Sequence, residues 1–461
     1  MVLYGRSGLA QARYQEAHRK RSHVYLQETS TLSPNIIARA DHNISRAQIS
    51  ENALKVLYRL KSAGYSSYMV GGGVRDLLLG REPKDFDIAT DARPEQVHTL
   101  FRNCRIIGRR FRLAHVQFSH EIIEVATFRA NQSPVHDQDE THNDTSRILR
   151  DNTYGTLEQD AFRRDFTVNA LYYDIRDFSL RDYVDGLADL RSGTLRLIGD
   201  PHTRYREDPV RMLRAVRFAA KLGFRIHPDT AAPVAPLSAL LDDIPPARLF
   251  EEILKLFLYG FGLQSFESLR HYGLFARLFP RTDAILDTEE QGFPHTFIAQ
   301  ALASTDARVN VDKPVTPAFL FAALLWEPVR QQAMALQAQG LHPGEAIRRA
   351  ADEIIPQQIS RVALPRRFAT PMIEIYQLQP RFGQRDGKRP LRLLAHPRFR
   401  AAYDFLVLRA AAGEVDQELA HWWTEIQNTD AAGQASVLSV APSAGPRRNR
   451  RRRRRQTSPS A

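Results

Sequence analysis

The spacing of apolar residues predicts a first part made of both strands and helices. Apolar residues recur at helical intervals over 51–63, with Ser50 as a suitable N-cap and Gly64 as a stop. Beyond this helix, short apolar runs bounded by glycine or polar residues predict strands. The predicted strands are 68–70, 84–90, 115–119 and 121–128, and the helices between them are 74–79 and 94–101. This order of elements predicts a small head of mixed α+β fold.

The pattern changes near residue 200, after which strand signals largely stop. The stretch from Arg206 to Gly223 has helical spacing, and apolar residues within 244–260 recur at i, i+1, i+4, i+5 and i+8. Further helices are predicted at 317–326, 330–339, 343–354, 368–378, 390–395 and 398–412. We therefore expect the second part of the chain to be all-α.

The patterns divide the chain into five predicted regions. They are an N-terminal extension (1–45), a mixed-sheet head (46–200), a helical neck (201–262), an all-α body (263–429) and an arginine-rich tail (430–461). The extension is polar and aperiodic and the tail is biased in composition, so we expect both termini to be disordered.

The net charge of the chain is concentrated at one end. The 461 residues include 64 Lys and Arg against 52 Asp and Glu, a formal net charge of +12. Eight arginines of the tail carry most of it, and 12 − 8 leaves +4 for the rest. They are Arg447, Arg448, Arg450, Arg451, Arg452, Arg453, Arg454 and Arg455. Such a run suits nucleic acid, whose phosphates release counterions when they are neutralised. An anionic membrane surface would also attract it, and a tail that serves only solubility is the third interpretation.

Apolar runs and cysteine content exclude several classes of protein. The longest apolar run, Ala318 to Trp326, has nine residues, whereas a transmembrane helix needs about 20. The first residues lack the apolar segment of a secretory signal. Cys104 is the only cysteine, which excludes an internal disulfide and a cysteine-based zinc or iron–sulfur site. We expect a protein without membrane spans in the reducing cytoplasm.

A polar segment, 131–152, interrupts the head and is predicted to be a loop. It contains residue types that bind metals, but without the spacing of a metal site. These residues are His136, Asp137, Asp139, His142 and Asp144. A solvated loop is the simpler interpretation.

Candidate chemistry gathers in residues 70–90, VGGGVRDLLLGREPKDFDIAT. The glycines at 71–73 allow the backbone to approach an anion closely, at the start of a predicted helix. Asp85 and Asp87 are two residues apart in a predicted strand, which points both side chains to the same face. Neighbouring carboxylates repel each other unless a cation lies between them, and Mg²⁺ prefers carboxylates together with water and phosphate oxygens. A glycine turn followed by this pair indicates nucleotidyl transfer.

This stretch resembles the signature of the DNA polymerase β-type nucleotidyltransferase superfamily. Within that superfamily, GGxVRD…DxD is similar to the family of tRNA CCA-adding enzymes and bacterial poly(A) polymerases. RRDFTVNAL at 163–171 resembles the ribose-binding motif of the family, and REDPVRMLRAVRFA at 206–219 resembles its base-recognition helix. The resemblance covers about residues 50 to 280. It implies a nucleotidyltransferase head, a neck that recognises the nucleotide, and a body that binds RNA.

The resemblance assigns roles to residues of the first motif. Asp85 and Asp87 would hold two Mg²⁺ ions, or Mn²⁺ in their place, while the RNA 3′-hydroxyl attacks the α-phosphate of the nucleotide. Gly71, Gly72 and Arg75 would bind the triphosphate, with Arg75 as a charge-assisted donor.

Three assignments stay open at this stage. Asp165 fits either a third catalytic carboxylate or an acceptor for a ribose hydroxyl. Glu124, in the predicted strand 121–128, is a rival third carboxylate, or it faces solvent. Asp76 either orients Arg75 or simply occupies the start of a helix, where a negative charge is favourable.

Arginines of the other two motifs would contact the nucleotide. Arg164 would contact its ribose or phosphates. Asp208, Arg211, Arg214 and Arg217 recur every three residues, so they share one drifting stripe of a predicted helix. The pattern alone allows an exposed face of ion pairs, whereas the resemblance favours contact with the edge of the incoming base.

Within the family, the segment after the predicted metal strand favours polyadenylation. Residues 106–116 place Arg109, Arg110 and Arg112 where CCA-adding enzymes tend to have a less basic strand with glycine. The tail would hold RNA by its backbone without reading sequence. We therefore expect addition of AMP from ATP to RNA 3′ ends, with RNA-decay proteins as further partners. The alternatives are a tRNA CCA-adding enzyme and, from a different class, a non-catalytic RNA-binding protein on the same fold.

Overall fold

The computed structural model describes residues 33–108, 112–130, 153–290 and 293–429. The predictions for residues 1–32, for the polar segment 131–152 and for the tail 430–461 therefore lie outside the described residues. In the part of the chain that is described, no helix is both long and apolar enough to cross a membrane.

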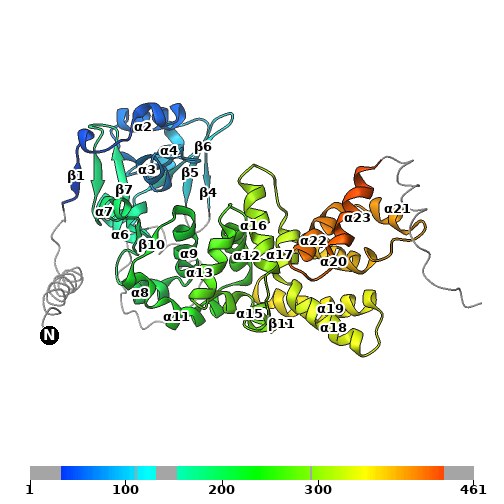
Figure 1. Cartoon of the computed structure of the whole chain (residues 1–461). Coiled ribbons are helices and arrows are strands. Elements are labelled where there is room, and N and C mark those ends of the chain that lie inside the picture. Colours follow the sequence, from blue (N-terminus) through cyan, green and yellow to red (C-terminus); the bar gives the residue numbers. More distant parts are fainter. Residues whose placement is uncertain (1–32, 109–111, 131–152, 291–292, 430–461) are drawn as a thin grey trace, which may run out of the picture. The chain divides into compact units, whose positions relative to one another are not determined.

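The described chain forms two compact units (Figure 1). The first unit runs to Ile244 and also contains Glu267–Arg277. The second contains Pro245–Phe266 and the chain from Leu278 onward. The five regions predicted from the sequence are a finer division, and they stay predictions.

A mixed sheet of eight strands forms the centre of the first unit. In chain order the strands are β1 (Asn35–Ile37), β2 (Ser67–Val70), β3 (Asp87–Thr90), β4 (Cys104–Ile107), β5 (Leu113–Gln117), β6 (Ile122–Thr127), β7 (Leu171–Asp174) and β8 (Leu180–Asp182). Their order across the sheet is β1-β8-β7-β2-β3-β6-β5-β4. Strands β3 and β6 are parallel, and their register places Asp87 opposite Glu124. The α+β class predicted from the sequence is confirmed.

Helices pack against this sheet, and α2, α3 and α4 contact its strands directly. The helices of the head are α2 (Glu51–Ser62), α3 (Gly72–Leu78), α4 (Pro94–Leu100), α6 (Leu157–Arg163) and α7 (Gly186–Ser192), with 3-10 turns η1 (Arg39–Asp41), η2 (Arg46–Gln48) and η3 (Thr167–Asn169). Ser50 caps α2 as predicted, because its hydroxyl oxygen accepts the amide hydrogen of Ala53 at 3.0 Å. Pro94 occupies the first turn of α4, where its missing amide hydrogen is not needed.

Four strands of the sheet, β1, β4, β7 and β8, are absent from the sequence prediction. These strands are only three or four residues long, too short to show a clear alternation of apolar and polar residues. Strand β7 is also buried along its whole length, so it has no polar face. The prediction that Asp85 lies in a strand with Asp87 is wrong. The neighbouring strand β2 ends at Val70, opposite Asp87, because Gly71 turns the chain into α3. Asp85 therefore precedes β3 and is exposed.

Helices α8 to α11 follow the head within the first unit. The elements after the sheet are α8 (Pro201–Glu207), α9 (Val210–Leu222), α10 (Pro228–Ala231), α11 (Val234–Leu237) and η4 (Ser238–Asp243), with a small ladder of β9 (Thr194–Leu195) and β10 (Arg225–Ile226). Asp208 ends α8 and Pro209 precedes α9, so the prediction of one helix running from Asp208 is wrong. Pro209 has no amide hydrogen and cannot continue α8. Gly223 ends α9 as predicted, in the left-handed conformation with φ 73°.

The chain from Pro246 onward is helical, as predicted. Its elements are α12 (Pro246–Phe257), α13 (Gly262–His271), α14 (Leu274–Leu278), α15 (Pro280–Leu286), α16 (Phe297–Val309), α17 (Pro317–Leu324), α18 (Trp326–Ala338), α19 (Pro343–Arg361), α20 (Arg366–Leu378), η5 (Gln379–Arg381), α21 (Arg389–Leu394), α22 (Phe399–Ala411) and α23 (Gln417–Asn428), with a short ladder of β11 (Glu289–Glu290) and β12 (Phe293–Pro294). Helix α19 continues through Pro356, although a proline removes one helical hydrogen bond. Buried Ile354, Ile355 and Gln358 on both sides of the proline anchor the helix to the core.

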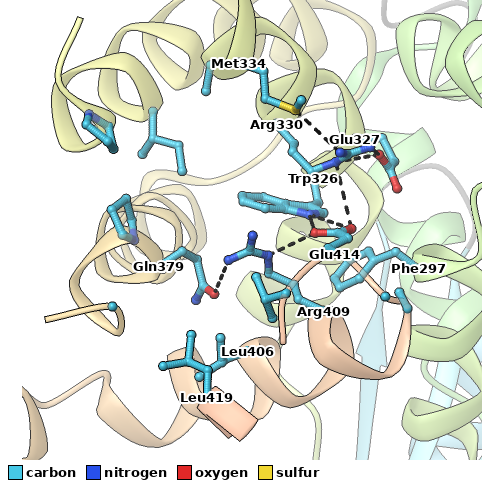
Figure 2. Close-up of a pocket in the computed structure, with 18 of the residues that line it drawn as sticks. Phe297, Trp326, Glu327, Arg330, Met334, Gln379, Leu406, Arg409, Glu414 and Leu419 are labelled. Carbon is cyan, nitrogen blue, oxygen red and sulfur yellow. Dashed lines mark hydrogen bonds and ion pairs between the residues drawn. The ribbon is translucent and has the colours of Figure 1, made fainter. Parts of the chain in front are cut away.

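A cavity of about 1020 Å³ in the second unit is lined by residues of α16, α18, α19, η5, α22 and α23 (Figure 2). Trp326 and Arg409 both donate hydrogen bonds to Glu414. The indole Nε1 of Trp326 lies 2.8 Å from the carboxylate, and the guanidinium Nε of Arg409 lies 2.9 Å from it. The guanidinium also lies over the indole ring, 4.8 Å from its centroid. On the same wall Arg330 donates to buried Glu327 at 2.9 Å. Alternating charges thus tie α18 to the end of α22.

Candidate active site

The glycine turn brings a carboxylate and a guanidinium close together. Gly71 has φ 77°, which favours glycine, and it joins β2 to α3. A Cβ at this position would lie 3.5 Å from Asp87 Oδ2 and 3.7 Å from Arg164 Nη1. The absence of a side chain on Gly71 therefore leaves space between an anionic and a cationic group.

Three carboxylates gather beside this turn. Asp87, the first residue of β3, faces Glu124 of β6 in register, and Asp85 lies two residues before it. The pKa of Asp87 is raised to about 6: burial raises it most, the charges of Glu124 and Asp85 also raise it, and the charge of Arg164 lowers it. His115 on β5 reaches Glu124, with 3.4 Å between Nε2 and Oε2. The carboxylates repel one another, and a cation would relieve that repulsion.

The donor set therefore suits Mg²⁺, although the carboxylates are not yet arranged as a complete metal site. Among the described residues, no group of three or more His, Cys, Asp or Glu side chains could hold a metal ion as it stands. Two or three carboxylates with open positions are the usual protein contribution to a Mg²⁺ site, where water and phosphate oxygens complete the shell.

Asp165 points away from these carboxylates, toward α9. Its Oδ2 accepts from Arg214 Nε at 2.9 Å and Nη2 at 2.5 Å. Its Oδ1 accepts from the amide of Phe166 at 2.8 Å and from Asn169 Nδ2 at 3.3 Å. Burial alone would raise the pKa of Asp165, but Arg214 and these hydrogen bonds hold it below its usual range. Both oxygens are thus committed to orienting other groups.

Arg75 is held in the wall of the site. Only 2% of it is exposed, and it donates to Asp76 from Nε at 2.8 Å and to Asn169 from Nη1 at 2.7 Å. Asp76 is therefore the partner of Arg75. Because Asn169 also donates to Asp165, a chain of polar contacts runs from Arg75 to Arg214.

The arginine stripe of α9 divides into two parts. Arg214 and Arg217 lie over the ring of Phe218, 5.3 and 4.6 Å from its centroid. Arg211 instead donates to Glu207 of α8 at 2.8 Å, and Asp208 accepts from the amide of Val210 at 3.2 Å. The structure thus brings Arg214 and Arg217 together with Arg75, which also lies 5.5 Å from the Phe218 centroid. Arg211 lies against α8 instead of in this group.

Residues outside the predicted set hold Arg164 in place. Asp160 is 1% exposed and binds Arg164, Arg163 and the hydroxyl of Tyr172. Arg204 of α8 donates from Nη2 to the main-chain oxygens of Arg163 and Arg164, at 2.8 and 2.7 Å. Asp160 has one sequence signal, its place one turn before the RRD motif. Tyr172 and Arg204 have no such signal in the sequence, because they come close to Arg164 only through the packing of the sheet and of α8.

Comparison with known proteins agrees with this geometry. Residues 67–196 match a family model described as the poly A polymerase head domain. Residues 223–286 match "Probable RNA and SrmB- binding site of polymerase A", and 339–457 match the polymerase A arginine-rich C-terminus. Poly(A) polymerase I of Escherichia coli is 51% identical over 428 residues, which cover 90% of each chain.

The chain belongs to the bacterial poly(A) polymerase I family.

CCA-adding enzymes are more distant relatives of this poly(A) polymerase family member. The CCA-adding enzyme of Levilactobacillus brevis is 39% identical over 206 residues, 45% of this chain and 50% of that protein. The solved structure of the Bacillus stearothermophilus CCA-adding enzyme in complex with CTP is also similar, with a TM-score of 0.52 and 26% identity. That match covers 86% of this chain and 88% of the other. The Escherichia coli relative is thus matched over 90% of its length, whereas the sequence match to the CCA-adding enzyme of Levilactobacillus brevis spans half of that protein.

The basic residues used to choose within the family are only partly described. Arg112 forms an ion pair with Glu95 on α4. Arg109, Arg110 and the eight tail arginines lie outside the described residues.

Proposed function

We propose that this member of the poly(A) polymerase family transfers AMP from ATP to an RNA 3′-hydroxyl, with release of pyrophosphate. The observation that carries the proposal is the meeting of Asp87, Glu124 and Arg164 at the Gly71 turn. The position suits a triphosphate, because the open turn leaves room for phosphate, Arg164 offers a positive charge, and the carboxylates attract a divalent metal. Family membership identifies the reaction as polyadenylation.

Asp85 and Asp87 are the proposed metal ligands, with Glu124 as a third carboxylate beside them. Two Mg²⁺ ions, when bound, would activate the attacking hydroxyl and stabilise the pyrophosphate that leaves. Glu124 is preferred to Asp165 in this role because it lies opposite Asp87. Both oxygens of Asp165 already accept hydrogen bonds, from Arg214, Asn169 and a main-chain amide.

The remaining side chains are proposed to position the nucleotide. Gly71, Gly72 and Arg164 would bind its phosphates. Arg214, held by Asp165, and Arg217 would face the base. Arg75 is buried against Asp76 and Asn169, so we propose that it shapes the phosphate site through the turn that it supports. Arg211 and Asp208 would fix α9 against α8.

RNA is proposed to bind outside the head, on the all-α body predicted at 263–429 and on the tail. The family models of an RNA-binding segment and an arginine-rich C-terminus support this division. The eight tail arginines would contact RNA phosphates. A cytoplasmic location and contacts with RNA-decay proteins stay predictions from the sequence.

Incorporation of single nucleotides tests the proposal. The full chain is incubated with a generic RNA 3′ end, Mg²⁺ and each NTP separately. We expect long tails with ATP alone and no growth when EDTA removes the metal. Addition of only C, C and A to a tRNA lacking its 3′ end would favour the CCA-adding alternative instead. This alternative is tested because the chain is similar to CCA-adding enzymes. RNA binding without incorporation would favour the non-catalytic alternative.

A further inference from the structure

A buried carboxylate, Asp160 of α6, is the centre of a hydrogen-bond cluster behind the proposed phosphate site. Its Oδ1 accepts from Arg163 Nε at 2.8 Å and from the amide of Arg129 at 3.2 Å. Its Oδ2 accepts from Arg164 Nη2 at 3.1 Å and from the Tyr172 hydroxyl at 2.8 Å. The pKa of Asp160 is lowered: burial would raise it, but Arg164 and Arg163 outweigh burial. Asp160 is therefore a fixed negative charge that two arginines share.

Tyr172 links the sheet to this cluster. It is fully buried on β7, in register with Val70, the residue before the Gly71 turn. Its hydroxyl donates to Asp160 and accepts from Arg164 Nε at 2.9 Å, and its ring centroid lies 5.3 Å from the guanidinium carbon. Burial raises the pKa of Tyr172 far above its usual range, so the hydroxyl keeps the proton that it donates.

These contacts fix the direction of one nitrogen of Arg164. Asp160 and Tyr172 hold Nε and Nη2 from behind. Nη1 donates no hydrogen bond to a described residue and lies 3.7 Å from the position of a Cβ on Gly71. A planar guanidinium held at two of its nitrogens can turn only slightly, so its third nitrogen is aimed at the Gly71 turn.

We propose that Asp160 and Tyr172 are positioning residues that aim Arg164 Nη1 at a phosphate of the incoming nucleotide. The inference rests on the proposed function, in which Arg164 binds phosphate, and adds to it the pair of residues that orients Arg164. Neither Asp160 nor Tyr172 touches the nucleotide. A preorganised guanidinium binds phosphate more tightly than a mobile one, since less side-chain entropy is lost on binding.

The test uses Tyr172→Phe, which removes one hydroxyl and keeps the buried ring. Tyr173→Phe is the matched control, because Tyr173 is the next residue of β7, is equally buried, and its hydroxyl has no hydrogen bond to a described residue. We expect Tyr172→Phe to raise KM for ATP about tenfold with kcat nearly unchanged, the mark of lost binding common to ground and transition states. Tyr173→Phe should leave KM unchanged.

Calorimetric titration of the free enzyme separates phosphate contact from a general loss of structure. Tyr172→Phe should weaken binding of tripolyphosphate about tenfold and leave binding of adenosine unchanged. In an Arg164→Ala background the same substitution should have no further effect, because its target is gone. An equal loss for tripolyphosphate and adenosine, or the same tenfold loss in both backgrounds, would overturn the inference. Asp160→Asn is less informative, since it leaves two buried arginines unbalanced.

Failure of the proposed function would look different. If the wild-type protein added no AMP to RNA, the polyadenylation proposal would fall. The titrations with tripolyphosphate and adenosine would still decide whether Asp160 and Tyr172 act through Arg164.

Discussion

Asp87 and Arg164 carry opposite charges, and both lie within 4 Å of where a side chain on Gly71 would begin. The pKa of Asp87, raised to about 6, shows that the one arginine does not compensate burial and the two neighbouring carboxylates. At the scale of single residues, the site is thus an arrangement of charges that its own side chains leave unbalanced. A metal and a triphosphate together would restore the balance.

Gly71→Ala should abolish most activity. The methyl group would enter the space between Asp87 and Arg164, and displacement of a reactant by about 1 Å can cost roughly 100-fold in rate. Gly80→Ala is the matched control, since Gly80 also has a positive φ, 69°, but nothing lies within 4 Å of its added Cβ. Both variants should lose about 1 kcal/mol of stability from backbone strain. Equal rates of AMP incorporation in both variants would contradict the phosphate site.

Asp87→Ala and Asp85→Ala should each abolish AMP incorporation, because each removes a proposed metal ligand. RNA retention on a filter should stay within about twofold of wild type, since the RNA contacts are proposed to lie elsewhere. Glu82→Ala, an exposed carboxylate on the same segment, is the control and should keep full activity. Activity within tenfold of wild type for Asp87→Ala would show that the metal assignment is wrong.

Helix α22 shows how the second unit is held together at the scale of elements. Its two arginines form ion pairs in opposite surroundings (Figure 2 shows the inner one). Arg409 is 14% exposed and bridges Glu414 and Gln379, whereas Arg400 is 70% exposed and pairs with Asp404 one turn away. An ion pair shielded from water is strongly coupled to its surroundings, and an exposed one is not.

Arg409→Ala should therefore lower the free energy of unfolding of the second unit by about 3–5 kcal/mol, because Glu414 would lose the nearer of its two arginines and Trp326 the group that covers it. Arg400→Ala should cost at most about 1 kcal/mol. Thermal denaturation of both variants measures the difference. Similar melting temperatures for the two would mean that the charges around the cavity contribute no more than surface pairs.

The distribution of charge is the property that belongs to the whole molecule. Of the formal +12, eight positive charges are the tail arginines, and all other residues together carry +4. An arginine run attracts RNA of any sequence, whereas the nucleotide is proposed to bind at the head and α9. The two tasks are therefore separable by mutation.

Replacing the eight tail arginines by serine should weaken RNA binding and flatten its dependence on salt. If all eight neutralise phosphates of single-stranded RNA, the slope of log K against log salt should become shallower by up to about 6. Fluorescence anisotropy at several KCl concentrations measures this slope. The rate of AMP addition at saturating RNA should stay unchanged, and an unchanged slope would show that the tail does not bind RNA.

The sequence alone predicted the chemistry proposed for the site, because Gly71, Asp87 and Arg164 belong to short motifs that resemble those of nucleotidyltransferases. It also determined the helical second half, since helical periodicity is local. Tertiary structure decided which of these groups meet. The parallel pairing of β3 with β6 places Glu124 opposite Asp87. The packing of α9 places Arg214 where it forms an ion pair with Asp165. The contacts of Asp160, Tyr172 and Arg204 around Arg164 were recognised only in the tertiary structure, because contacts between distant elements leave no periodic pattern in the chain.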